Sequence, residues 1–228
     1  MSHDIYPSLS GASAAWRHLE VISNNIANTS TTGFKEQRLT FESALVGEGP
    51  LGEGYVQVAP MEQDFSDGII VADGVDTHFA LRGRGFFQLE DGSLSRSGAF
   101  TMDRNGFLVT MEGEKVMGNS GAIRLERGER MSVGIDGRVL VDGAEIDSLA
   151  LVDAEDLEPM GGSRWQANSE VYPANVDVVQ GALEGSNADP MRLMTDLIQT
   201  TRYFEIYRSA MQASNELDRT NIAIVREA

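Results

Sequence analysis

The side chains that most often catalyse reactions or bind metals are few in this sequence, and they are scattered. The chain of 228 residues has no cysteine, which excludes disulfides, thiolate metal sites, iron–sulfur clusters and cysteine nucleophiles. Its three histidines are His3, His18 and His78, and no two of them have the i, i+4 spacing of a metal-binding helix. We therefore expect surface or core histidines, no metal site and no cofactor.

Four short segments approach the pattern of a catalytic or ligand-binding motif, and each lacks an essential residue. The glycines of 47–54 are not followed by the Lys-Ser/Thr ending of a phosphate loop, and GRGFF at 83–87 lacks the third glycine of a dinucleotide site. DRNG at 103–106 lacks the spaced Glu of a calcium loop and is typical of a hairpin turn. GNSG at 118–121 is one residue too short for a nucleophile elbow. None of these segments predicts an active site.

Carboxylates dominate the charge of the chain. There are 35 acidic and 18 basic residues, a net charge of −17 and a pI near 4.5. A field of that sign repels nucleic acids and anionic membranes, so binding to either is disfavoured. In so acidic a chain a close group such as Asp153, Glu155 and Asp156 is expected by chance, and it favours a solvated face over a catalytic pair.

The first residues show neither the basic nor the apolar region of a secretory signal peptide. Elsewhere, no apolar run approaches the roughly 18 residues that span a bilayer. We expect a protein without membrane insertion which, if it leaves the cytoplasm, uses a route other than a cleaved signal.

The elements that position these residues follow the order helix, strands, helix. Residues 8–28 have apolar side chains at steps of three and four, which predicts an amphipathic helix. The stripe consists of Leu9, Ala12, Trp16, Leu19, Ile22 and Ile26. The following run NTSTTG at 28–33 is typical of a helix end. Residues 36–66 show no sustained period and are expected to form an extended or loop connector.

Short β-rich runs separated by Asp-Gly and Asn-Gly dipeptides fill residues 67–186. Two of these runs, 106–110 and 138–141, are too short for helices and are bounded by turns. The pattern predicts an antiparallel β domain curled into a barrel or a sandwich.

A long helix is predicted from 190 onward, with Asp189 as its N-cap and Pro190 at its first position. A four-three alternation of mainly apolar residues defines its seam: Leu193, Leu197, Thr200, Phe204, Tyr207, Met211 and Ser214. Leu217, Asn221 and Ile224 continue the seam after a three-residue step, which is a stammer in a coiled-coil repeat. Such a seam is too long for a small β domain or the shorter first helix to cover, so it predicts assembly.

Three parts of the chain resemble one family of proteins. SNNIANTSTTGFK at 23–35 resembles the signature that follows the first helix in bacterial flagellar rod and hook proteins. QGALEGSN at 180–187, with the helix after it, resembles their C-terminal signature. Between them, GRGFF at 83–87, RSGAF at 96–100 and NGFLVT at 105–110 resemble their central β motif. The chain is therefore similar to the flagellar basal-body rod family, and within it to the proximal rod members.

The resemblance implies an α+β fold and a structural function without enzymatic activity. The terminal parts, 1–35 and 187–228, would form an inner coiled-coil domain, 36–66 the connector, and 67–186 an outer β domain. The subunit would be exported by the flagellar type III apparatus without a cleaved signal peptide. It would then assemble with copies of itself, other rod proteins and the surrounding basal-body rings in the periplasm. The product would be the hollow rod, a drive shaft that carries torque from motor to hook.

Residue roles follow from the same resemblance. Asn24, Asn25, Asn28 and Thr29 are expected to satisfy backbone groups where the first helix ends. Gly33 is expected to have a positive φ, and Phe34 to anchor the next segment. The remaining assembly residues are expected on the two helix stripes: Leu9, Trp16, Leu19, Ile22, Ile26, Leu193, Leu197, Phe204, Tyr207 and Met211.

Three alternatives stay open at this point. The chain could be the distal rod protein of the same family, or a non-flagellar secreted subunit with a coiled-coil stem. An enzyme with a β-barrel active site is the third, and it would need a clustered acid, base or metal that the sequence lacks.

Overall fold

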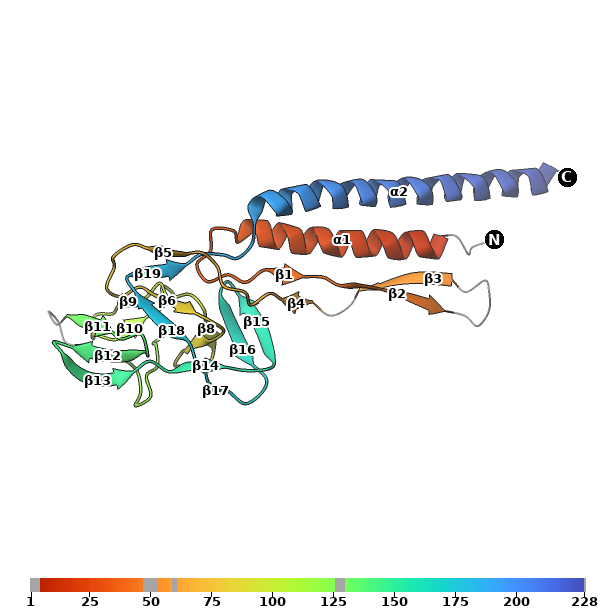
Figure 1. The fold of residues 1–228 in the computed structure, drawn as a ribbon. Coiled ribbons are helices and arrows are strands. Elements are labelled where there is room, and N and C mark those ends of the chain that lie inside the picture. The colour runs from red at the N-terminus through yellow and green to blue at the C-terminus, as the bar shows by residue number, and fades with distance from the viewer. Residues whose placement is uncertain (1–4, 47–52, 59–60, 126–129, 228) are drawn as a thin grey trace. The chain divides into compact units, whose positions relative to one another are not determined.

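The computed structural model describes residues 5–46, 53–58, 61–125 and 130–227, and the chain divides into two compact units (Figure 1). The helical unit consists of Met1–Ala27, Gln37–Asp64 and Asp189–Ala228, and the strand unit of Asn28–Glu36 and Phe65–Ala188. His3 and most of the glycine-rich segment at 47–54 lie outside the described residues.

Two antiparallel helices, α1 (Ile5–Ala27) and α2 (Pro190–Glu227), dominate the helical unit. Both predicted helices are confirmed. Asp189 caps α2 as expected, because its Oδ1 accepts hydrogen bonds from the backbone N–H of Met191 (2.9 Å) and Arg192 (3.4 Å). With 38 residues against 23, α2 is roughly 57 Å long and α1 roughly 35 Å, at about 1.5 Å per residue.

Four strands of the helical unit lie where the sequence shows no sustained period. β1 (Gln37–Arg38) pairs with β4 (Glu62–Gln63), and β2 (Phe41–Val46) pairs with β3 (Glu53–Val58), both antiparallel. α1 contacts β1 and β3 as well as α2. Much of the segment expected as a connector is therefore an ordered part of the helical unit.

The face that α1 buries follows the predicted stripe only in part: Ala12 and Ile22 are buried, Leu19 and Ile26 are half-buried, and Leu9 and Trp16 are exposed. Leu9 and Trp16 are 53% and 54% exposed, although the Trp16 ring contacts that of Phe204 at 5.9 Å between centroids. Because α1 packs against both α2 and strands, its buried face is broad and contains many small residues. At Gly11, for example, a Cβ atom would lie 2.6 Å from the Tyr207 ring. The buried apolar residues of α1 are Ala12, Ala14, Ala15, Val21 and Ile22.

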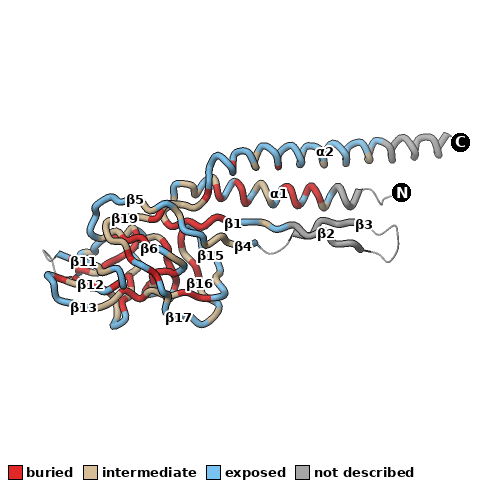
Figure 2. Tube along the Cα trace, in the orientation of Figure 1, coloured by how far each residue is buried: buried red, intermediate tan, exposed pale blue. Residues whose placement is uncertain are grey.

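In α2 the described side chains that are not exposed follow the predicted seam. Leu193 and Thr200 are buried, and Leu197, Phe204, Tyr207, Met211 and Ser214 are half-buried, together with Asp196. The rest of the described α2 surface is exposed, as Figure 2 shows. The continuation at Leu217, Asn221 and Ile224 lies outside the described side chains.

The strand unit is built from small antiparallel sheets. The largest has the order β15 (Leu157–Gly161), β16 (Arg164–Ala167), β8 (Leu94–Ser95), β7 (Phe86–Gln88), β14 (Leu151–Asp153), β17 (Tyr172–Pro173). A three-stranded sheet contains β11 (Met131–Val133), β12 (Arg138–Val141) and β13 (Ala144–Ser148). Three two-stranded ribbons pair β5 (Ile70–Ala72) with β19 (Ala182–Glu184), β6 (Phe79–Arg82) with β18 (Asp177–Gln180), and β9 (Thr101–Met102) with β10 (Leu108–Val109).

The α+β class is confirmed, but the expected barrel is not formed by the described residues. The six-stranded sheet ends in β15 and β17, which do not pair with each other, and most strands have only two to four residues. Such short strands turn away before a continuous ladder can close. Coiled-coil packing of the terminal helices stays a prediction.

The strand unit encloses two apolar clusters. The larger cluster includes Phe79, Phe87 and Phe100. The rings of Phe87 and Phe100 make an edge-to-face contact, with a distance of 5.0 Å between their centroids. The smaller consists of Phe86, Leu94 and Trp165. Together the two clusters give the strand unit a hydrophobic core of its own, and Figure 2 shows the many buried segments of this unit in red.

Charge is distributed unequally along the chain. α1 has one acidic and one basic residue, and α2 has five of each, so neither helix has a net charge. Residues 67–186 have 21 acidic and 10 basic residues. The acidity of the chain is therefore concentrated in the strand-forming part.

Candidate functional site: a buried ionic cluster

Four charged side chains meet inside the strand unit, and we call them the ionic cluster: Lys35, Asp67, Arg96 and Glu184. They belong to the segment after α1, the segment before β5, the end of β8 and the end of β19. The side chains of Lys35, Arg96 and Glu184 are each 1% exposed, and that of Asp67 is 39% exposed. Segments far apart in sequence are thus joined by buried charge.

Glu184 lies at the centre of the ionic cluster. Its Oε1 accepts hydrogen bonds from Lys35 Nζ at 2.7 Å and from the Gly68 backbone N–H at 2.8 Å. Its Oε2 accepts one from Arg96 Nε at 2.5 Å. Its backbone carbonyl accepts a fourth from the Gly33 N–H at 2.8 Å. One residue therefore holds the segment after α1, the segment before β5 and the end of β8.

Arg96 uses all five of its N–H donors. Besides the bond to Glu184, Nη1 donates to the carbonyls of Gly83 (2.7 Å) and Gly85 (2.5 Å), and Nη2 donates to Asp67 Oδ1 (3.1 Å) and the Leu81 carbonyl (3.0 Å). A lysine has three donors and no planar fork, so it could not replace this arginine.

Lys35 is the second cation on the Glu184 carboxylate. Its Nζ also donates to the Ser66 carbonyl at 2.7 Å. Burial lowers the pKa of the Lys35 ammonium, and the charge of Arg96 lowers it further, while the bond to Glu184 opposes both effects. Every charged atom here is occupied by a structural partner, so the arrangement holds segments together and offers no free acid or base.

Gly33 has the predicted positive φ, at +68°. A Cβ atom there would lie 2.6 Å from the backbone carbon of Arg96 and 2.6 Å from the backbone nitrogen of Ser97. Both the conformation and the lack of space require glycine. Phe34, the next residue, is buried as expected.

Asparagine side chains bond backbone groups in each of the two units. In the helical unit, the amide of the buried Asn25 donates to the Gln37 carbonyl (2.8 Å) and accepts from the Gln37 N–H (3.0 Å). In the strand unit, Asn187 Oδ1 accepts from the Glu36 N–H at 2.7 Å, and its Nδ2 donates to Ser66. Asn28 Oδ1 accepts from the Thr31 hydroxyl at 3.1 Å. Asn24 is exposed, and Thr29 is half-buried.

The sequence alone predicted no role for Lys35, Arg96, Glu184 or Asn187. All four lie in the segments that carry the family resemblance, at 23–35, 96–100 and 180–187. One feature of the sequence could have indicated these residues: a charged residue inside an otherwise apolar or glycine-rich motif, such as Glu184 between Leu183 and Gly185. Segments that look like separate motifs in sequence converge on one cluster.

The residues first considered for chemistry do not converge on an active site. His78 Nδ1 lies 2.6 Å from Asp73 Oδ2 in an exposed turn. Asp153 is buried and bonded to Arg84, whereas Glu155 and Asp156 are exposed. DRNG at 103–106 forms the expected turn, because Asp103 Oδ1 accepts from the N–H groups of Asn105 and Phe107. Within the described residues, no group of three or more His, Asp or Glu could hold a metal ion.

No described helix combines the length and the apolar character needed to cross a bilayer.

His18 lies in a hollow of about 400 Å³ between α1 and α2, together with Asp196, Thr200, Tyr203 and Tyr207. Its Nδ1 is 3.3 Å from the Thr200 hydroxyl. Burial lowers the pKa of the His18 imidazole below its usual 6.5, and Asp196 partly offsets this.

Acid is therefore expected to weaken the helix pair. When the folded pKa is lowered, the unfolded state binds more protons below pH 6.5, so stability rises with pH in that window and falls on acidification. Thermal melts of the helical circular dichroism signal at pH 7.5 and 5.0 should show a smaller pH effect in a His18→Asn chain. An identical pH effect in both chains would contradict the assignment.

Comparisons with known proteins indicate that the chain is a structural protein. Three family models match successive parts of the chain: "Flagella basal body rod protein" at 5–35, "Flagellar hook protein FlgE/F/G D1 domain" at 80–141, and "Flagellar basal body rod FlgEFG protein C-terminal" at 179–224. The first covers α1 with Gly33 and Lys35, the second includes Arg96, and the third includes Glu184 and most of α2. The class is that of the axial structural proteins of the bacterial flagellum.

Individual relatives are similar over nearly the whole chain. The flagellar basal-body rod protein FlgF of Rhizobium meliloti is 31% identical, over 94% of each chain. FlgF of Caulobacter vibrioides is 30% identical over 97% of each. The rod protein FlgG of Agrobacterium fabrum is 30% identical over 91% of this chain and 93% of its own. This chain belongs to the flagellar basal-body rod protein family, which is structural and not enzymatic.

Proposed function

We propose that the chain is a subunit of the proximal part of the rod. It assembles through its terminal helices with copies of itself and with neighbouring rod proteins into the hollow shaft that carries torque to the hook. The inner coiled-coil domain would comprise 1–35 and 187–228. The observation that carries the proposal is similarity to rod proteins across 94% of the chain. The distal rod is the second candidate, because a FlgG relative is 30% identical over 91% of the chain.

Export and location belong to the same proposal. The subunit would leave through the flagellar type III apparatus without a cleaved signal peptide and reach a rod that spans the periplasm inside the basal-body rings. The absence of net charge on the helices and the absence of cysteine suit a chain that is exported unfolded and assembles in an oxidising compartment.

The surface of α2 supports assembly through helices. On the side away from the α1 contact it exposes a second group of large apolar residues: Met191, Met194, Ile198 and Ile206. Met191, Met194 and Ile198 have helical spacing of three and four, so they share one face. A helix with apolar residues on two sides is typical of the interior of an assembly. Contacts to the export apparatus and the rings rest on the family resemblance alone.

Replacing Ile198 by aspartate should block rod assembly without unfolding the subunit. Ile198 is 56% exposed, so the single chain loses little when it is changed, whereas a charge buried between subunits costs several kcal/mol. Motility and isolated basal bodies would be examined in a strain whose own gene is deleted, with subunit levels matched by immunoblot.

Ala210→Asp is the matched control, because it places the same charge at an exposed position about 120° around α2 from Ile198, at roughly 100° per residue. Motile cells with Ile198→Asp, or equal loss in both variants, would oppose assembly through this face. Localisation of the tagged subunit to the membrane-proximal or hook-proximal rod by electron microscopy separates the two rod candidates.

A further inference from the structure

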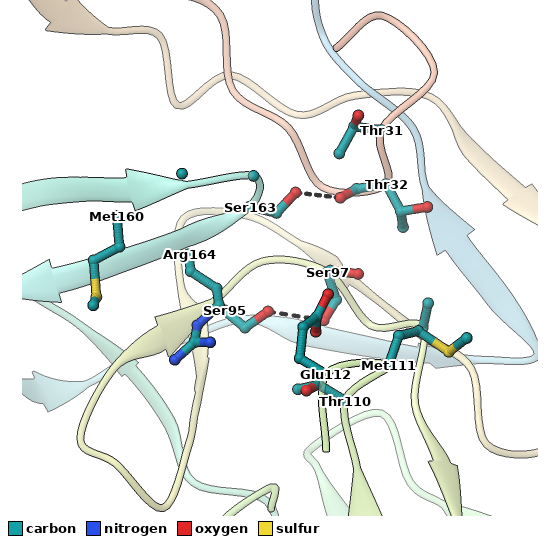
Figure 3. A pocket seen from close by; sticks show the side chains of 13 residues that line it. Thr31, Thr32, Ser95, Ser97, Thr110, Met111, Glu112, Met160, Ser163 and Arg164 are labelled. Carbon is teal, nitrogen blue, oxygen red and sulfur yellow. Dashed lines mark hydrogen bonds between the residues drawn. The ribbon is translucent and has the colours of Figure 1, made fainter. Parts of the chain in front are cut away.

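A pocket of about 510 Å³ lies in the strand unit, and none of its lining residues belongs to the ionic cluster. Figure 3 shows its walls: the turn after α1 with Thr31 and Thr32, the chain around Ser95 and Ser97, the turn after β10, and the β15–β16 hairpin. The volume is within the range of ligand sites. Neither the fold nor the family comparisons assign it a role.

Six residues of the pocket lining have hydroxyl groups, and three of these hydroxyls donate their protons within the protein. Ser163 Oγ donates to the Thr32 carbonyl, and Ser95 Oγ donates to the Ser97 carbonyl at 3.1 Å, as the dashed lines in Figure 3 show. Thr31 Oγ1 donates to Asn28 Oδ1 at 3.1 Å. A hydroxyl has one proton, so after donating it offers only lone pairs. These three residues therefore present hydrogen-bond acceptors, and Ser95 and Ser163 are both more than nine-tenths buried.

The charges at the pocket favour a cation. Glu112 is its only acidic lining residue and is exposed. Arg164 is its only basic one. Its Nη2 donates to Asp91 Oδ2 at 2.5 Å and to Ser93 Oγ at 2.9 Å, so Asp91 balances its charge from outside the lining, while its buried Nε has no hydrogen-bond partner among the described residues. The other charge in the lining is the carboxylate of Glu112, and the chain as a whole has a net charge of −17. A ligand rich in donors and positive charge fits these groups.

Two methionines form the apolar part of the pocket. Met111 and Met160 are largely exposed and lie on opposite sides of it in Figure 3. Flexible thioether side chains adapt to an aliphatic stem placed between them. None of the thirteen lining residues is aromatic, whereas stacking on a sugar or a base requires a ring. The lining thus suits a long side chain with a cationic end.

We propose that this pocket binds an arginine side chain presented by another polypeptide, with its stem between Met111 and Met160 and its guanidinium on the hydroxyl acceptors and Glu112. A guanidinium has five donors in a planar fork and can bind several separate acceptors together, whereas an ammonium is a point charge with three. The proposal rests on the proposed function only for the origin of that polypeptide, which would be a neighbouring rod subunit.

The test uses the purified full chain, labelled with ¹⁵N, and capped tripeptides. Acetyl-Gly-Arg-Gly-amide is compared with its citrulline counterpart, which has nearly the same shape without the charge. We expect the arginine peptide to shift the amide resonances of 110–112 and 160–164, and to bind about tenfold more tightly than the citrulline peptide, since one charge-assisted hydrogen bond is worth about that factor.

Two variants keep the test specific to the pocket. Glu112→Gln should weaken arginine binding about tenfold, and Met111→Ala should weaken it severalfold. Both residues are exposed, so the fold should tolerate the changes. Glu170→Gln removes an exposed acid of the same unit outside the pocket and should leave the affinity unchanged.

The proposal is overturned if the citrulline peptide binds equally well, or if Glu112→Gln and Glu170→Gln weaken binding equally. It is also overturned if neither peptide shifts the pocket resonances, or if a neutral oligosaccharide shifts them instead. Because the assay uses no cells, its failure leaves the rod assignment intact. Conversely, a failed motility test of α2 leaves the binding result unaffected.

Discussion

Replacing Glu184 by glutamine is expected to lower the free energy of unfolding of the strand unit by about 3–5 kcal/mol. The change leaves Lys35 and Arg96 buried beside each other without their shared counter-ion. Urea denaturation of the full chain measures the effect. In a Trp16→Phe background the only remaining tryptophan is Trp165, which lies buried in the strand unit and reports on its unfolding.

A double variant separates loss of charge balance from loss of packing. Lys35→Met combined with Glu184→Gln removes one cation with the anion, and Arg96 keeps its bond to Asp67. We expect this chain to be more stable than Glu184→Gln alone. Glu170→Gln, an exposed change, should stay within about 0.5 kcal/mol of the parent chain. If Glu184→Gln is equally mild, the ionic cluster does not hold the unit together.

The second large effect is expected at Gly33. Gly33→Val should destabilise the strand unit by several kcal/mol and stop rod assembly. A β-branched residue at φ +68° pays about 1–2 kcal/mol for the conformation alone. Its Cβ would also meet the backbone of Arg96 and Ser97, and moving that backbone would displace the Arg96 guanidinium from Glu184. Urea unfolding followed by Trp165 fluorescence, together with motility, measures both consequences.

Gly92→Val separates the two causes. Gly92 has φ +83°, but nothing lies within 4 Å of a Cβ atom built there. This variant should therefore pay only the conformational cost of about 1–2 kcal/mol and leave the cells motile. Equal losses at the two glycines would mean that close approach at Gly33 adds nothing.

The elements that local rules determine could be predicted from the sequence. The helices follow from apolar spacing and from the Asp189-Pro190 cap, and the run at 138–141 is a strand, β12, with those bounds. The positive φ of Gly33 follows from its place in a polar helix-ending run. In each of these cases the residues that determine the conformation are within a few positions of one another.

The ionic cluster could not be predicted because its partners are distant in sequence. Lys35 and Glu184 are 149 positions apart, and Arg96 and Glu184 are 88 apart. In a chain with 35 acidic residues, composition alone does not select the partner of a given cation. The same limit applies to the β1–β4 and β2–β3 pairs, whose formation depends on packing against α1.

The buried face of α1 was predicted only in part, for a different reason. Sequence periodicity gives weight to large apolar residues, so it selected Leu9 and Trp16. The structure buries Ala12 and Ile22 of the predicted stripe, and it also buries Ala14 and Ala15, whose small size permits close approach of neighbouring elements. Leu9 and Trp16 stay candidates for contacts in the assembly.

The unequal distribution of charge has a consequence for a shaft made of many copies. Repeated α2 helices can pack without net charge repulsion, since each has five acidic and five basic residues. Repeated strand units, with 21 acidic and 10 basic residues over 67–186, act on one another as a polyelectrolyte with a counter-ion atmosphere. That repulsion is screened over about 8–10 Å at physiological ionic strength. We therefore expect ionic strength to change the repulsion between strand units much more than the packing between helices, which have no net charge.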